Sequence, residues 1–313
     1  MRTQARGLAA SVADVVVEKV TPAAWPPMRA RDVAKEFSPP WPDLLVTCGR
    51  RSAFLAGWLR GRGARRMIAA HVQDPRRSLA PFDLVVAMGH DRIAEGGKVI
   101  KVATALHDIT PKALASAAAI WRERLAALGR PLAGVLIGGT TSRGGFSSGQ
   151  RRSLVGGLAS LRSGGWSLAI ASSRRTPAAL NDDLAAAFGE HDGVWLWRGD
   201  GDNPYRGILA LADRLVVTGD SVSMISEALA SGAPVEVFDL AMPHFSLFID
   251  PLLGGGVLRR FAGDPEPGRR RPPIDATPVA AAAARRLLQA RGLEPRTGSD
   301  EESCSRAIQS AVT

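Results

Sequence analysis

The stretch DRLVVTGDSVSMISEALASGAPVEVF, from Asp213 to Phe238, has the pattern of one parallel β-α-β unit. The apolar run at 215–217 predicts a strand, and the following residues carry apolar side chains at helical spacing up to Leu229. A Ser-Gly pair then ends the helix, and Pro234 opens a second apolar run at 235–238. Because parallel strands need such a helical crossover, the stretch predicts an α/β protein with a parallel sheet.

The turn from Thr218 to Ser221 joins the first of these strands to the helix. Open α/β sheets bind ligands at the carboxyl ends of their strands, where the following helix also presents free N–H groups. The turn is therefore a candidate anion site. Asp220 and Ser221 are also residue types that cap helices, so a purely structural role is the alternative.

Three more predicted strands in the second half of the chain end in loops of similar chemistry. The strand at 134–137 precedes a Gly/Ser/Thr loop, the strand at 166–171 an arginine pair, and the strand at 194–197 a Gly/Asp/Asn loop. Small residues let a phosphate approach the backbone, hydroxyl and N–H groups donate to its oxygens, and arginine neutralises its charge. Together these loops predict a site for nucleotide phosphates. None of them contains a P-loop or a dinucleotide fingerprint.

We expect the diphosphate of a nucleotide sugar to lie over these loops. A carboxylate repels phosphate, so Asp220 would cap the helix or brace the loop, whereas Glu227 would accept hydrogen bonds from ribose hydroxyls. A flexible loop without ligand and a solvated arginine pair are the structural alternatives. The predicted ligand-binding residues are Gly138, Gly139, Thr140, Thr141, Ser142, Arg174, Arg175, Asp220, Ser221, Ser223 and Glu227.

The length of 313 residues exceeds what one core usually fills, so two domains are expected. We predict an N-terminal Rossmann-like domain at 1–112, a bridging helix at 113–130, a C-terminal Rossmann-like nucleotide-binding domain at 131–298, and a C-terminal helix at 299–313. The sequence has no apolar run long enough to span a membrane and no signal-peptide core, so we expect a cytoplasmic protein. Two cysteines and five histidines form no ligand pattern, so neither a metal nor a cofactor is predicted.

The formal net charge of +10 is concentrated in the first half of the chain. Between Arg50 and Arg77 there are eight arginines and one acidic residue, Asp74. This bias predicts an anionic partner, which can be lipid headgroups, a phosphorylated substrate or nucleic acid. Of these we expect an anionic membrane surface, bound peripherally at the inner face, and no nucleic acid. A solvated basic face enlarged by the codon bias of a GC-rich bacterial genome is the alternative. The candidate membrane-contact residues are Arg50, Arg51, Phe54, Trp58, Arg60, Arg62, Arg65 and Arg66.

Four segments carry a resemblance to a known family. They are HVQDPRR at 71–77, VLIGGTTSRGG at 135–145, SSRRTP at 172–177 and VTGDSVSMISEALASGAPVEVF at 217–238. The chain resembles the plant "elongated mitochondria" mitochondrial-fission factor family over nearly its whole length. The resemblance implies a glycosyltransferase B-type architecture, in which two Rossmann-like domains face each other across a cleft. For the plant members it implies a peripheral outer-mitochondrial protein that recruits a dynamin-related GTPase.

Members of that family usually begin with a strand and a Gly-rich turn ahead of a helix that contains glutamine. In this chain only the helix, TQARGLAASV from Thr3, is matched. We therefore expect the first domain to lack its first strand, which would leave an unpaired strand edge or an exposed apolar surface beside the helix. We also expect the natural reading frame to begin upstream of Met1.

Two functions follow from this architecture. A metal-independent glycosyltransferase would bind a nucleotide sugar in the second domain and would need a base to deprotonate the acceptor. His71, Asp74, His107 and Asp108 follow predicted strand ends of the first domain and are the candidates for that base. A non-enzymatic peripheral membrane adaptor, which recruits a partner of unknown identity, is the alternative.

Overall fold

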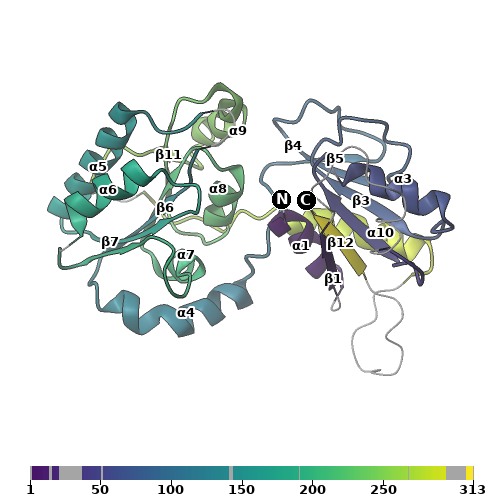
Figure 1. Ribbon diagram of the computed structural model, residues 1–313, viewed down its shortest axis with the longest axis horizontal. Coiled ribbons are helices and arrows are strands. Elements are labelled where there is room, and N and C mark those ends of the chain that lie inside the picture. The colour runs from purple at the N-terminus through teal and green to yellow at the C-terminus, as the bar shows by residue number, and fades with distance from the viewer. Residues whose placement is uncertain are drawn as a thin grey trace. The chain divides into compact units, whose positions relative to one another are not determined.

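The computed structural model describes residues 2–13, 16–20, 37–50, 52–140, 144–189, 191–266, 268–293 and 308–312. The chain forms two compact units, Met1–Asp108 together with Asp275–Thr313, and Ile109–Ile274 (Figure 1). Each unit contains a six-stranded sheet in which every strand pair is parallel. The predicted α/β class is confirmed.

The first unit has the strand order β1-β12-β2-β3-β4-β5. Helix α3 packs on it through Leu55 and Leu59 in a cluster with Leu45 and Val85, whereas α1 and α10 contact each other and the sheet. The elements of this unit are α1 Arg2–Ala10, β1 Val16–Val20, β2 Leu44–Cys48, α3 Ala53–Gly61, β3 Ile68–Val72, β4 Leu84–Met88, β5 Val99–Val102, α10 Thr277–Ala290 and β12 Ile308–Val312.

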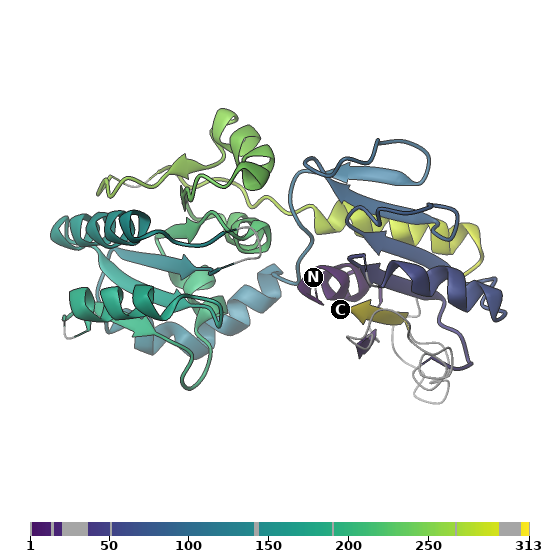
Figure 2. The same ribbon diagram turned by 45° about the horizontal axis from the view of Figure 1, so that its top comes forward.

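The predicted C-terminal helix at 299–313 is wrong for residues 308–312, and the rest of it lies outside the described residues. Residues 308–312 form strand β12, which lies between β1 and β2 and pairs in parallel with both. The predicted gap beside α1 is therefore filled by this strand (Figure 2). Local helix preference is a weak signal, and pairing with two strands far away in the sequence outweighs it.

The second unit has the strand order β11-β10-β9-β6-β7-β8 with helices on both faces (Figure 1). Leucines of α5 and α6 form one core cluster with alternate residues of the sheet, and α4, α7 and α8 form the other. The elements are α4 Pro111–Ala126, β6 Leu132–Ile137, α5 Ser148–Ser163, β7 Ser167–Ser172, α6 Ala178–Phe188, β8 Val194–Trp197, α7 Tyr205–Leu211, β9 Arg214–Thr218, α8 Val222–Leu229, β10 Val235–Phe238, α9 Pro243–Gly254 and β11 Arg259–Arg260.

The boundaries of the two units differ from the predicted domain boundaries at both places where the chain passes from one unit to the other. The predicted bridging helix is α4, which belongs to the second unit. Its Trp121 packs closely on Gly207 of α7, because a Cβ at Gly207 would lie 2.4 Å from the indole ring. Helix α10 falls within the predicted second domain but belongs to the first unit. The chain thus enters and leaves the second unit once each, near Ile109 and Ile274.

Candidate functional site

The carboxyl ends of β9, β6 and β7 form one rim, because these strands are neighbours in the sheet. The loops that follow them are joined by hydrogen bonds. Gly139 N–H donates to Asp220 Oδ2 at 2.7 Å, and Gly138 N–H donates to Thr218 Oγ1 at 2.8 Å. On the other side, Thr140 N–H donates to the Arg175 carbonyl at 3.1 Å. The predicted convergence of these loops is present within the second unit.

Two glycines allow the loops to approach so closely. A Cβ at Gly138 would lie 2.0 Å from an Asp220 carboxylate oxygen, and a Cβ at Gly139 would lie 2.0 Å from the Arg175 carbonyl oxygen. No L side chain fits at either distance. The Gly-Gly pair after β6 therefore serves as a packing element between the two neighbouring loops, in addition to any contact with a ligand.

Asp220 braces the rim from inside. It is 3% exposed, and its carboxylate accepts hydrogen bonds from Gly139 N–H and from the Thr218 hydroxyl at 2.6 Å. Burial raises the pKa of Asp220 above its ordinary value, and these hydrogen bonds oppose that change. Ser221, not Asp220, caps α8, because its hydroxyl accepts from Met224 N–H at 3.3 Å. Of the two predicted roles for Asp220, bracing is the one present.

The arginine pair follows β7 in a loop held by hydroxyl groups. Ser173 Oγ and Thr176 Oγ1 donate to the Gly138 carbonyl at 2.9 and 2.6 Å. This fixes the backbone while the side chains of Arg174 and Arg175 are exposed. The positive charge of Arg175 lowers the pKa of Asp220 and so opposes the effect of burial. Thr141 and Ser142, also predicted to bind the ligand, lie outside the described residues.

Glu227 lies on α8, one turn beyond Ser223, and is 7% exposed. Its carboxylate accepts a hydrogen bond from the Tyr205 hydroxyl at 2.5 Å. Tyr205 and Arg206 line a groove of about 630 Å³ between α4 and α7. That volume lies in the range of small-molecule sites. Tyr205 was not among the predicted site residues, although its place after a strand-end loop and its being the one tyrosine of the chain could have singled it out.

His71 differs from its predicted position. It does not follow a strand but lies inside β3, is fully buried, and has its Nδ1 2.7 Å from Thr47 Oγ1 and its ring 4.9 Å from Phe82. Burial, with a smaller contribution from the charge of Arg77, lowers the pKa of His71 to about 3. A buried core histidine of this kind has no route to an acceptor.

The other three base candidates lie on loops of the first unit. Asp74 accepts a hydrogen bond from Arg76 N–H at 2.8 Å, and Asp108 lies 3.6 Å from Arg6. His107 is 2% exposed, with Nε2 3.5 Å from Asp275 Oδ1, and burial lowers its pKa although Asp275 and Asp108 oppose this. His107 and Asp108 are neighbours in the sequence, and Asp74 lies on a separate loop of the same unit.

The predicted membrane-contact residues lie just before, on and just after α3, and several of their side chains are exposed to solvent. Arg50, Arg65 and Arg66 are exposed, and Phe54 and Trp58 are half-buried. The guanidinium of Arg62 lies over the Trp58 ring at 4.4 Å. Arg60 is different, because it forms an ion pair with Asp83 and is partly buried. Arg51 lies outside the described residues.

Among the described residues no helix is long and apolar enough to cross a membrane. Within the same residues no group of three or more His, Cys, Asp or Glu side chains has the arrangement of a metal site.

Solved structures share this two-unit fold at low sequence identity. UDP-GlcNAc 2-epimerase from Neisseria meningitidis, determined bound to UDP-GlcNAc, is 11% identical with a TM-score of 0.55, over 93% of this chain and 98% of that chain. UDP-GlcNAc 2-epimerase from Methanocaldococcus jannaschii is 13% identical with a TM-score of 0.53, over 83% and 79%. The fold is thus of the glycosyltransferase B type.

A protein family matches almost the whole chain. The model described as "Mitochondrial fission ELM1" covers residues 1–288, and the chain belongs to this family. "Mitochondrial fission protein ELM1" of Arabidopsis thaliana is 32% identical over 282 residues, which cover 82% of this chain and 66% of the relative's length. A protein of Rickettsia prowazekii (strain Madrid E) is 26% identical over 263 residues, covering 70% of this chain and 72% of that protein.

Proposed function

We propose that the second unit binds the diphosphate of a nucleotide sugar at the rim formed by the loops after β6, β7 and β9. The observation that carries this proposal is the joining of these loops by Asp220, Gly138 and Gly139, which brings Arg174, Arg175 and the amino end of α8 to one edge. Arginine and helix N-termini are the groups that favour phosphate. The Neisseria meningitidis structure of the same fold, bound to UDP-GlcNAc, supports this class of ligand.

We place the nucleoside in the groove beside α7. Tyr205 joins the groove to Glu227, so a ribose there could donate its hydroxyls to this carboxylate in place of the tyrosine. Ser221 and Ser223 precede Glu227 on the same helix, where their hydroxyls would face phosphate oxygens. This arrangement uses the acidic residue for the sugar and keeps it apart from the phosphates.

Replacing Arg174 with alanine should weaken binding of a nucleoside diphosphate by about 1.5–3 kcal/mol, the scale of a hydrogen bond to a charged group. The fold should be unaffected because this side chain is exposed. Calorimetry with uridine, guanosine, cytidine and thymidine diphosphates measures the change. The control is Arg162→Ala. Arg162 lies in the last turn of α5, at the end of that helix away from the rim, so this variant should bind as the wild type does. Equal affinities in both variants would contradict the proposed phosphate site.

We further propose a metal-independent transfer of the sugar to an acceptor bound by the first unit, with Asp74 or Asp108 as base, because His107, like His71, is buried. The alternative is a non-enzymatic adaptor, which the family's association with mitochondrial fission supports. An adaptor needs no anion rim. Failure of all four nucleoside diphosphates to bind the wild-type protein would favour the adaptor.

We also propose that the exposed arginines after α3 contact an anionic membrane. Each arginine near such a surface contributes about 1 kcal/mol, so Arg65→Gln/Arg66→Gln should reduce binding to anionic liposomes roughly 30-fold at low salt. Flotation with and without added salt measures this. Arg285→Gln/Arg286→Gln removes the same charge from α10 and is the control. Equal recovery of the wild type on neutral liposomes would refute electrostatic contact.

A further inference from the structure

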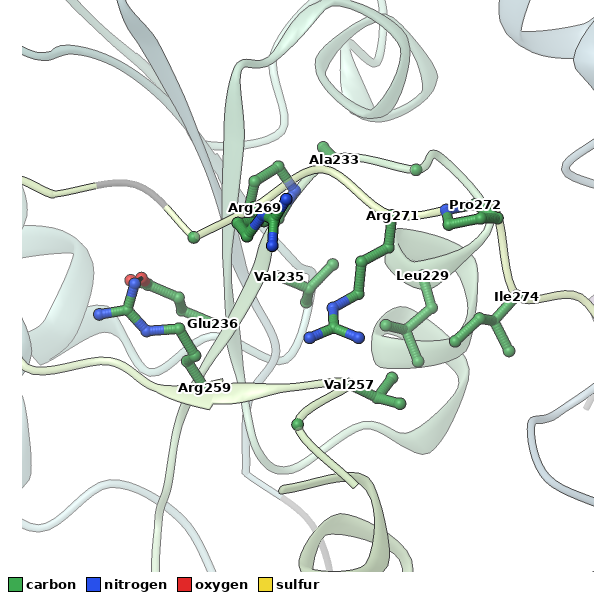
Figure 3. A pocket seen from close by; sticks show the side chains of 14 residues that line it. Leu229, Ala233, Val235, Glu236, Val257, Arg259, Arg269, Arg271, Pro272 and Ile274 are labelled. Carbon is green, nitrogen blue, oxygen red and sulfur yellow. Dashed lines mark ion pairs between the residues drawn. The ribbon is translucent and has the colours of Figure 1, made fainter. Parts of the chain in front are cut away.

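A second pocket lies in the second unit at the amino ends of β10 and β11, the opposite end of the strands from the rim (Figure 3). Its volume is about 50 Å³. A single water needs about 10–15 Å³ by the same measure, so the pocket has room for a group of several heavy atoms. Gly232, Gly256 and Gly268 form part of its wall.

The charges around this pocket are positive in sum. Arg259, Arg269 and Arg271 line it, and the one acidic lining residue among those described is Glu236. The negative charge of that carboxylate is already neutralised by the fully buried Arg214, with which it forms an ion pair. Arg259 lies 3.9 Å from the same carboxylate and 3.4 Å from Asp264. The pocket therefore has no negative charge left for its other two arginines.

Arg269 and Arg271 are exposed residues, and the described part of the chain provides no hydrogen bond or ion pair for their guanidinium groups. Figure 3 shows both side chains entering the pocket from one segment, with Glu236 and Arg259 at one end. Leu229, Val257 and Ile274 form the other, apolar end. Two unpaired guanidinium groups that face the same pocket can bind a planar or tetrahedral oxyanion.

We propose that this pocket binds a phosphate monoester group, held by Arg269 and Arg271, with a small apolar portion of the ligand against Leu229, Val257 and Ile274. The dianionic charge of the phosphate matches the two unpaired guanidinium groups. Such a group can belong to a free phosphate compound or to a lipid headgroup. The site is separate from the rim that carries the proposed nucleotide site.

Arg271→Gln should raise the dissociation constant for inorganic phosphate at least tenfold, because a charge-assisted hydrogen bond is lost. The matched control is Arg270→Gln. Arg270 belongs to the same segment and carries the same charge, but its guanidinium donates to the Ala212 carbonyl at 3.4 Å and does not line the pocket. Phosphorus NMR titration at constant ionic strength, with chloride as the competing anion, gives the constants. Circular dichroism checks that both variants are folded.

Three results would overturn the proposal. They are equal constants for the Arg271 and Arg270 variants, no response of the wild type to phosphate beyond that to chloride, and loss of the response in Arg174→Ala, which would place the phosphate at the rim. Retention of the response in Arg174→Ala, with its loss in Arg271→Gln, separates this pocket from the nucleotide site. Failure of nucleoside diphosphates to bind would contradict the nucleotide site at the rim but not the phosphate site in this pocket.

The source of the phosphate is decided by vesicles of phosphatidylcholine with and without phosphatidic acid. If the group belongs to a lipid, Arg271→Gln should lose the phosphatidic-acid-dependent part of binding, whereas Arg270→Gln should keep it. If the group belongs to a free compound, only the titration with inorganic phosphate should separate the two variants. A pair of variants that behave alike in both assays contradicts the site altogether.

Discussion

Replacing Arg214 with methionine is expected to lower the free energy of unfolding of the second unit by about 3–5 kcal/mol, the cost of leaving a buried charge without its partner. Arg214 is 0% exposed and forms an ion pair with Glu236, which is 2% exposed. It also donates to the Asp264 carbonyl at 2.9 Å and lies 4.9 Å from the Trp166 ring. Methionine supplies none of these hydrogen bonds.

Urea unfolding followed by tryptophan fluorescence measures this loss, because Trp166 lies beside the arginine. Arg259→Met is the comparison. It removes a second arginine near Glu236, but at 3.9 Å and with 46% of the side chain exposed, so its effect should be below about 1 kcal/mol. Adding Glu236→Leu to Arg214→Met should recover most of the stability. A loss no larger than that of Arg259→Met would show that the pair is not essential to folding.

The β9-α8-β10 unit could be predicted from sequence because its strands are buried on both faces. Buried parallel strands appear as continuous apolar runs, as at 215–217 and 235–238, and small residues mark the turns between them. The same pattern placed the arginine pair and the Gly-Gly loop at strand ends. Which carboxylate braces these loops depends on contacts between Asp220 and Gly139, which are far apart in the sequence.

Features that depend on distant pairing were not predicted. Strand β12 forms because residues 308–312 pair with both β1 and β2. Its own sequence has no strong strand pattern. The apolar run that predicts this strand does not show where pairing stops, and because β3 continues through Val72, His71 lies inside the strand. Tyr205 reaches Glu227 only once α7 and α8 are placed side by side on the same face.

The stability of the first unit is expected to fall as the pH is lowered from about 6.5 to about 3, in part because of His71. Its pKa is lowered to about 3 in the folded protein by burial, whereas in the unfolded chain it is near 6.5. Between these values the unfolded state binds the proton and the folded state does not. The contribution of neutral His71 is therefore complete above pH 6.5 and is lost by up to about 1.4 kcal/mol per pH unit below it.

His71→Gln tests this, because the amide can still form a hydrogen bond with Thr47 but does not titrate. The slope of unfolding free energy against pH between 6.5 and 3 should decrease by up to about 1.4 kcal/mol per pH unit in this variant. Thr47→Val loses the same hydrogen bond and keeps the ring, so its slope should equal that of the wild type. His107, whose pKa is also lowered by burial, adds to the slope in all three proteins. An unchanged slope in His71→Gln would mean that the buried ring accepts a proton in the folded state.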